Sequence, residues 1–350
     1  MRFNLNNKKR SVPFTFLILS VLFIILFVTD LLSGSVIISL KQVFFSFFPS
    51  SETNETFRTI ILEFRLPKAL TAIFTGAALS LSGLQMQTIF RNPLAGPYVL
   101  GISAGASLGV ALFVLGFSSV IAIGTFNFAG SWSLALVAWI GSFLVMMLVL
   151  YVSSRINDIM TILILGILFT SAVSAIVSIL QYFSSESMLK AFIIWTMGSL
   201  GSVTKSQLAI LTPALAAGTL LAFFKIKDLN AFLLGENYAQ SIGVSVKKSR
   251  VIILLSTSLL AGTITAFCGP VGFIGIAVPH ICRVLFKTAN HLVLIPGVIL
   301  TGSVVMLFSD IVSQLPGMQT TLPINSVTAL IGIPVIIWII IKNKKFVSVK

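Results

Sequence analysis

Long stretches without a single charged residue constrain this chain more than any other feature. The longest, Asn92–Ser154, runs for 63 residues, and a helix needs only about 20 apolar residues to cross the hydrocarbon core of a bilayer. Charged residues make up 9% of the sequence, against about 25% in soluble domains. The chain therefore lacks the charge to cover a soluble surface, and the sequence predicts a polytopic membrane protein.

The apolar runs, divided where Ser, Gly, Thr, Asn and Pro gather, predict an all-α protein with ten transmembrane helices. The expected ranges are 11–32, 62–90, 98–116, 132–153, 159–183, 206–224, 250–268, 272–286, 292–310 and 323–341. We expect Ser33–Phe57 to be an outside loop with Pro49, Ser50 and Ser51. The outside segment Ser184–Ser206 has room for a short amphipathic helix, and the inside segment 225–250 has room for one or two.

The cations indicate how these helices are oriented. An even number of spans places both ends of the chain on one side. The loops and ends on that side contain 17 Lys and Arg residues, and those on the other side contain 6. Cytoplasmic loops carry the excess of cations, so both termini are predicted to be cytoplasmic. The net charge of +14 is then a topology signal rather than a nucleic-acid surface. We treat residues 1–350 as one transmembrane domain.

The residues that would support catalysis or coupling are scarce. The sequence contains no G-x-x-x-x-G-K-[ST] loop for ATP, no metal-ligand cluster, and two cysteines at no redox or metal spacing. Carriers driven by an ion gradient usually show ionisable groups inside their spans, and Asp310 is nearly alone there. An integral membrane enzyme would need clustered acids or histidines. A stand-alone carrier and an enzyme remain alternatives, but energy supplied by a partner is the simpler interpretation.

Two glycine patterns fall in or between predicted spans. Gly101, Gly105 and Gly109 are spaced four apart, which allows close approach of another helix backbone, with or without a further role. The block from Gly269 and Pro270 through Gly272 to Gly275 ends one helix and starts another. Free backbone groups at such a break must be buried in protein or face a wet cavity, although Gly-Pro also occurs at plain turns.

Two polar segments are candidates for contact with other proteins. The segment Leu234–Val244 predicts a short helix over 237–242 that either caps the bundle or docks a soluble partner. Arg65 and Lys68 stand at the outside end of the second span, where cations are few. They either snorkel to headgroups or form salt bridges with an acidic partner.

Several blocks, in order, resemble the FecCD-type permease subunits of bacterial ABC importers for iron–siderophore complexes, haem and cobalamin. The matching blocks are Arg65-Leu-Pro-Lys68, Gly76–Gly83 with Gln87, Arg91-Asn-Pro-Leu-Ala-Gly-Pro97, Trp195–Ser199, Leu234–Val244, Gly269–Gly275 with Pro279, His280 and Arg283, and Leu322-Pro323 with 328–334. The resemblance extends from about residue 60 to the C-terminus. It implies ten helices per subunit and a path along the interface of two permease subunits.

The resemblance also implies roles for particular residues. Arg65 and Lys68 would meet glutamates of a binding protein, and Gln314 replaces an arginine that family members often carry, so Arg58 and Lys205 are further docking candidates. The cytoplasmic gate would lie at Ile159 and Met160. The residues expected at the ATPase, in coupling helices within 225–250, are Leu234, Gly235, Glu236, Ala239, Ser241 and Gly243.

The resulting expectation is a permease subunit of the bacterial inner membrane, with no catalytic residues of its own, that moves an iron–siderophore complex by alternating access. Haem or cobalamin is the alternative cargo. The expected partners are a second, identical or closely homologous permease subunit, two cytoplasmic ATPases that carry ATP and Mg²⁺, and a periplasmic or lipoprotein binding protein. We expect no metal or cofactor on this chain and no nucleic-acid partner.

Overall fold

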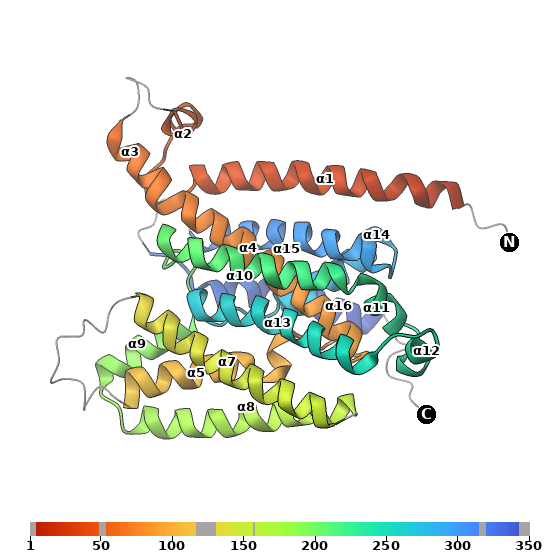
Figure 1. Cartoon of the computed structure of the whole chain (residues 1–350). Coiled ribbons are helices and arrows are strands. Elements are labelled where there is room, and N and C mark those ends of the chain that lie inside the picture. Colours follow the sequence, from red (N-terminus) through yellow and green to blue (C-terminus); the bar gives the residue numbers. More distant parts are fainter. Residues whose placement is uncertain (1–4, 49–53, 117–130, 157, 315–319, 343–350) are drawn as a thin grey trace.

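The computed structural model describes residues 5–48, 54–116, 131–156, 158–314 and 320–342, and every regular element in these ranges is helical. The all-helical prediction is therefore confirmed for this part of the chain. Among the helices in these ranges, seven are long and apolar enough to cross a membrane, and three shorter apolar helices occupy the remaining expected ranges. The main helices lie side by side along one direction (Figure 1).

The N-terminal half contains α1 (Leu5–Leu32), α2 (Leu40–Ser46), α3 (Glu55–Thr59), the π-helical segment η1 (Ile60–Arg65), α4 (Leu66–Ile89), the 3₁₀ turn η2 (Pro97–Leu100), α5 (Ile102–Ala111), the π-helical segment η3 (Leu112–Gly116), α7 (Ser131–Arg155) and α8 (Ile159–Tyr182). The C-terminal half contains α9 (Glu186–Thr196), α10 (Lys205–Phe224), α11 (Ile226–Phe232), α12 (Glu236–Ser241), α13 (Val246–Cys268), α14 (Ile274–Phe286), α15 (His291–Ser313) and α16 (Ile324–Lys342).

The region expected to be an outside loop is partly helical, which corrects the prediction. Ser39 caps α2 with a capping box in which Gln42 is the reciprocal partner. Asn54 caps α3, which continues through η1 into α4, so the second span begins before residue 62. Pro49, Ser50 and Ser51 lie outside the described residues. The short helices expected in 184–206 and 225–250 are confirmed as α9, α11 and α12.

Two groups of helices pack around two cores. The larger core includes residues of α1, α4, α10, α13, α14 and α15, and the smaller one includes residues of α5, α7, α8 and α9. Most of α4, α13 and α15 is buried, whereas α1 and α8 are largely exposed along their apolar faces. Figure 1 shows α5, α7, α8 and α9 grouped on one side of α13.

Backbone-to-backbone contact explains why α4 lies at the centre. A Cβ atom added to Gly76 would fall 2.1 Å from the carbonyl oxygen of Gly302 in α15, and one added to Gly83 would fall 1.7 Å from that of Gly275 in α14. Helices in membranes associate through such small residues, because hydrophobic burial gives little drive between helices that are already in lipid. A side chain at either glycine would separate α4 from its neighbours.

The bundle has two ends with different elements. At one end lie α2, α3, α9 and the start of α4; we call this the Lys68 end. At the other lie α11, α12, the start of α1 and the end of α16; we call this the α12 end (Figure 1).

Candidate functional site

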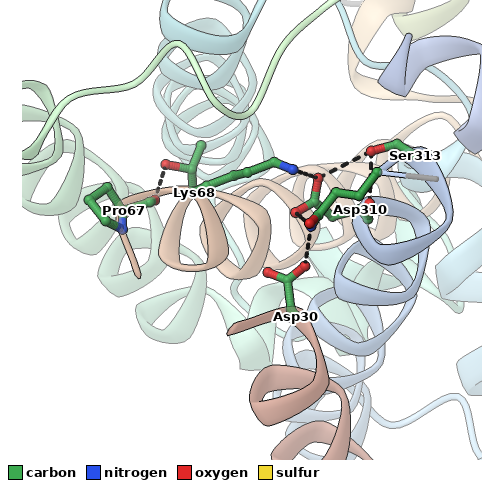
Figure 2. Close-up of polar contacts among 7 residues, drawn as sticks. Asp30, Pro67, Lys68, Asp310 and Ser313 are labelled. Carbon is green, nitrogen blue, oxygen red and sulfur yellow. Dashed lines mark hydrogen bonds and ion pairs between the residues drawn. The ribbon is translucent and has the colours of Figure 1, made fainter. Parts of the chain in front are cut away.

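A buried ion pair occupies the Lys68 end. Lys68 Nζ lies 3.0 Å from Asp310 Oδ1, and the Asp310 side chain is only 1% exposed. Figure 2 shows Lys68 of α4 and Asp30 of α1 converging on Asp310 of α15. Lys68 therefore has a partner within its own chain. Because removing one partner of a buried pair is strongly destabilising, this pair has a structural role.

Gln314 joins a second carboxylate to this pair. Its amide nitrogen donates to Asp30 Oδ1 at 2.7 Å and to Asp310 Oδ2 at 3.1 Å, and the Ser313 hydroxyl donates to Asp310 Oδ1 at 3.3 Å. We call Asp30, Lys68, Asp310 and Gln314 the outer cluster. The sequence suggested that Asp310 is nearly alone among the apolar helices. The structure corrects this, because Asp30 in the last turn of α1 lies beside it.

Arg65 is also engaged within the chain. Its guanidinium is buried and donates to the carbonyl oxygens of Leu31 at 2.8 Å and Leu32 at 2.9 Å, and to that of Val36. The last carbonyls of a helix have no intrahelical partner, so Arg65 completes the end of α1. The geometry gives Arg65 a structural role, and its docking role stays a prediction without support from this arrangement.

Arg58 and Lys205 are two of the exposed cations at this end, together with Lys41 and Lys190. Arg58 lies in α3 on a shallow surface pocket that also includes Glu55, Thr59 and Glu63. Lys205 begins α10, and its ammonium pairs with Glu63 while both side chains remain about half exposed. Surface pairs of this kind contribute little to stability, so Lys205 can exchange its partner at low cost.

A cleft of about 410 Å³ opens beside the outer cluster. Its walls are the loop after α9 and the start of α16, and Lys68 and Asp310 contribute to its lining together with Met197, Ser199 and Pro323. The Lys68 end therefore combines a cleft that contains the Lys68–Asp310 pair with exposed cations on its surface.

At the α12 end, the six predicted coupling residues differ in their exposure and contacts. Ala239 is fully buried against the chain. Glu236 accepts a hydrogen bond at 2.7 Å from the buried Arg250 in α13. Ser241 and Leu234 are exposed, and Gly235 and Gly243 have φ angles of 117° and 88°, which favour glycine. One face thus anchors α12, and the opposite face is exposed.

Beside its exposed polar residues, α12 and its two flanks expose three large apolar side chains spaced four residues apart. Leu234 is 65% exposed, Tyr238 47% and Ile242 55%. We call these three residues the α12 face. Large apolar side chains grouped on an exposed surface mark contact sites for proteins or membranes. The predicted short helix over 237–242 is confirmed to within one residue at each end.

The predicted glycine sites lie at close contacts between helices. A Cβ on Gly105 would fall 2.6 Å from the carbonyl oxygen of Gly141 in α7, and one on Gly109 would fall 2.3 Å from that of Val137. Gly101 instead has a φ of 76° and precedes α5 as its N-cap. Gly105 and Gly109 therefore allow α5 and α7 to touch.

The break between α13 and α14 is satisfied inside the protein. The Tyr98 hydroxyl donates to the Val271 carbonyl at 2.6 Å, and the Gly272 amide donates to Asn325 at 2.9 Å. A Cβ on Gly269 would fall 2.6 Å from the Trp195 carbonyl oxygen, and one on Gly275 would fall 2.8 Å from Pro97. Pro270 lies in this same break. These contacts bury the free backbone groups in protein.

The predicted gate lies at the start of α8. Met160 is 50% exposed, and the Ile159 side chain lies outside the described residues. Asp158 caps the helix: its carboxylate accepts from the Thr161 hydroxyl and from the amides of Met160 and Thr161. These hydrogen bonds lower the pKa of Asp158 below its ordinary value.

Comparison with known proteins decides the family. The model of the FecCD transport family matches residues 22–342. The chain belongs to this family. The hemin transport system permease protein HmuU of Yersinia pestis is 32% identical over 92% of this chain and 95% of its own length. The vitamin B12 import system permease protein BtuC of Salmonella typhi is 34% identical over 81% of this chain and 84% of its own length.

Solved structures agree with this assignment. An ABC transporter described as metal-chelate type, in an inward-facing conformation, has a TM-score of 0.81 at 29% identity and covers 94% of this chain and 99% of its own. PsaBC from Streptococcus pneumoniae shares the fold alone, with a TM-score of 0.52 and 17% identity. The chain is therefore a multi-pass membrane permease subunit of the ABC importer class and not an enzyme.

Sequence reasoning missed two members of the outer cluster. Asp30 is a single acid at the end of an apolar helix, and in the sequence Gln314 stands out only as the residue that replaces an arginine. The available signal for Asp30 is its position within a predicted span, because an ionisable residue there usually pairs with another polar group.

Proposed function

We propose that this FecCD family member is the transmembrane subunit of an ATP-driven importer for a metal chelate. The α12 face carries the proposal: at the α12 end, one large apolar side chain on α12 and one on each of its flanks are exposed, and Glu236 and Ala239 fix the helix to the bundle. A firmly held helix with an apolar outer face suits docking of a soluble protein. In this proposal the partner is an ABC ATPase, which holds ATP and Mg²⁺.

The orientation follows from the cations and the partner. The α12 end carries 17 of the 23 Lys and Arg residues in the ten-span topology, which places it in the cytoplasm. The Lys68 end then faces outward and receives a substrate-binding protein, through Arg58, Lys205 and the adjacent cleft. A second permease subunit, identical or homologous, covers the exposed apolar face of α8 and completes the path.

Transport in this proposal proceeds by alternating access. ATP-driven closure of two ATPases moves α12, and the bundle responds by closing one end of the path and opening the other. The cargo in this proposal is a metal chelate, like the hemin, vitamin B12 and metal chelate in the names of the similar proteins. A siderophore-bound iron remains the prediction from sequence, with haem and cobalamin as alternatives on equal footing.

Uptake by the reconstituted complex tests the proposal. Proteoliposomes that contain the permease, the ATPase and the binding protein would be offered a ferric siderophore, haem or cobalamin, with ATP inside. We expect ATP-dependent accumulation of one cargo and none when the ATPase is omitted. Accumulation that persists without the ATPase, driven by an ion gradient, would overturn the proposal in favour of a stand-alone carrier.

A further inference from the structure

A buried histidine joins three helices at the α12 end. His291 is the first residue of α15 and is 0% exposed. Its Nδ1 lies 2.8 Å from Asn230 Oδ1 in α11, and its Nε2 lies 2.9 Å from Thr88 Oγ1 near the end of α4. One imidazole ring therefore connects the segment before α12 to both α4 and α15.

The neighbouring groups fix the direction of these hydrogen bonds. The Asn230 amide nitrogen donates to Asn290 at 3.0 Å, which turns the Asn230 oxygen toward His291. That oxygen accepts the His291 backbone N–H at 2.9 Å as well. Nδ1 then carries the ring proton and donates to Asn230, which leaves Nε2 as an acceptor. The Thr88 hydroxyl lies 2.9 Å from Nε2 and 2.8 Å from the Leu84 carbonyl oxygen of its own helix, so its one proton is shared between these two acceptors. The ring is held in one orientation by donors and acceptors from separate helices.

The two helices that meet at His291 are joined along their length. Near the middle, Gly76 of α4 and Gly302 of α15 touch through their backbones. At the far end, Lys68 of α4 pairs with Asp310 of α15. A 24-residue helix is about 36 Å long. A displacement applied to the pair at the α12 end is therefore carried to the Lys68 end as a movement of one unit.

We propose that His291 is a positioning residue that fixes α11 and α12 to the α4–α15 pair, so that movement of α12 is delivered to the Lys68 end. The inference rests on the proposed function, in which α12 receives the motion of the ATPase. Thr88 and Asn230 are the two contacts through which the ring acts. Removing the Asn230 contact frees α11 from the ring, and removing the Thr88 contact frees the ring from α4, so in either case less of the movement of α12 reaches the Lys68 end.

The experiment reports both ends separately. An environment-sensitive fluorophore is attached at Ser241→Cys in α12 or at Ser202→Cys at the Lys68 end; both positions are exposed, whereas the native Cys268 and Cys282 are buried. The permease–ATPase complex in nanodiscs is compared with ADP and with ATP plus vanadate. We expect both labels to respond in the otherwise unsubstituted chain.

The variant Thr88→Val keeps the size of the side chain and removes its hydroxyl. We expect the Ser241 label to respond as before and the response at Ser202 to fall at least 5-fold, with Asn230→Ala giving the same pattern and Thr88→Ser restoring the response. The matched control is Ser303→Ala, which removes a buried hydroxyl that donates at 3.1 Å from α15 to Ile73 of α4. It should leave both responses intact.

The outcomes separate the inference from the function on which it rests. A Ser202 response in Thr88→Val and Asn230→Ala equal to that of the Ser303→Ala control would overturn the role of His291. A fall of the Ser202 response in Ser303→Ala equal to that in Thr88→Val would overturn it too, since any damage to the α4–α15 interface would then suffice. An unresponsive Ser241 label in the unsubstituted chain would instead contradict docking of the ATPase on α12, and the inference would fail with it.

Discussion

The two ends of the bundle use their distinctive side chains differently. At the Lys68 end, Arg65 and Lys68 are bound to carbonyls and a carboxylate of the same chain. At the α12 end, the α12 face is exposed while Glu236 and Ala239 secure the helix from behind. The comparison teaches that an outside cation is not by itself a docking residue. Its partners within the chain decide whether it is available.

The largest expected effect comes from breaking the outer cluster. Asp310→Ala leaves Lys68 without its carboxylate in a mostly buried site, and we expect the free energy of unfolding in mixed micelles to fall by about 3 kcal/mol. Asp30→Asn keeps a hydrogen-bonding side chain and lowers the negative charge around one lysine, so we expect a change of about 1 kcal/mol or less. A loss of about 1 kcal/mol or less in Asp310→Ala would show that the pair does not hold this end together.

A substitution in the α12 face should reduce binding of the ATPase and leave stability unchanged, which is the opposite of the outer cluster. Tyr238→Asp places a charge on an exposed apolar surface, so we expect stability to stay unchanged and affinity for the ATPase to fall at least 10-fold. Surface-immobilised permease in nanodiscs, titrated with ATPase, gives the affinity. Asn237→Asp, at an exposed position on the same helix, is the control for added charge. Wild-type affinity in the Tyr238 variant would remove α12 from the interface.

The exposed cations at the Lys68 end should show a smaller, salt-sensitive effect. Reversing both Arg58 and Lys205 to Glu is expected to slow association of the binding protein several-fold at low ionic strength, with the difference shrinking at high salt because exposed charges are screened. Lys41→Glu, on α2 of the same end, is the control. A loss that salt does not change would assign these residues another role.

The smallest effect is expected at the start of α8. Asp158→Ala removes the cap, so the amides of Met160 and Thr161 should exchange with deuterium faster. Since hydrogen bonding lowers the pKa of Asp158, the cap is fully effective above the ordinary aspartate value and weakens as pH falls through the lowered pKa. Unchanged exchange of both amides would show that the cap contributes nothing to the order of this turn.

Local features of the sequence predicted most of the fold. The short helix expected over 237–242 forms at Glu236–Ser241, because Gly243 in a left-handed conformation ends it as the composition indicated. The break at Gly269 and Pro270 likewise ends α13 where expected. Apolar runs and helix-terminating residues act on neighbours along the chain, so periodicity and composition reveal them.

The polar contacts between helices could not be predicted in this way. Gln314 meets Asp30, which is 284 positions away, and His291 meets Thr88, which is 203 positions away. Such pairs depend on which helices pack together, and no local pattern encodes that. Arg65 and Lys68 were located correctly on the second span, but their partners on α1 and α15 became visible only in the structure.

Site-specific photocrosslinking tests the central claim most directly, namely that the α12 face receives the ATPase. A benzoylphenylalanine replaces Tyr238 in the assembled complex, and the same probe replaces Ile176, an exposed apolar residue of α8, as the control. The account predicts a crosslink from position 238 to the ATPase and none from position 176. Absence of the crosslink at 238, or the same product from both positions, would contradict it.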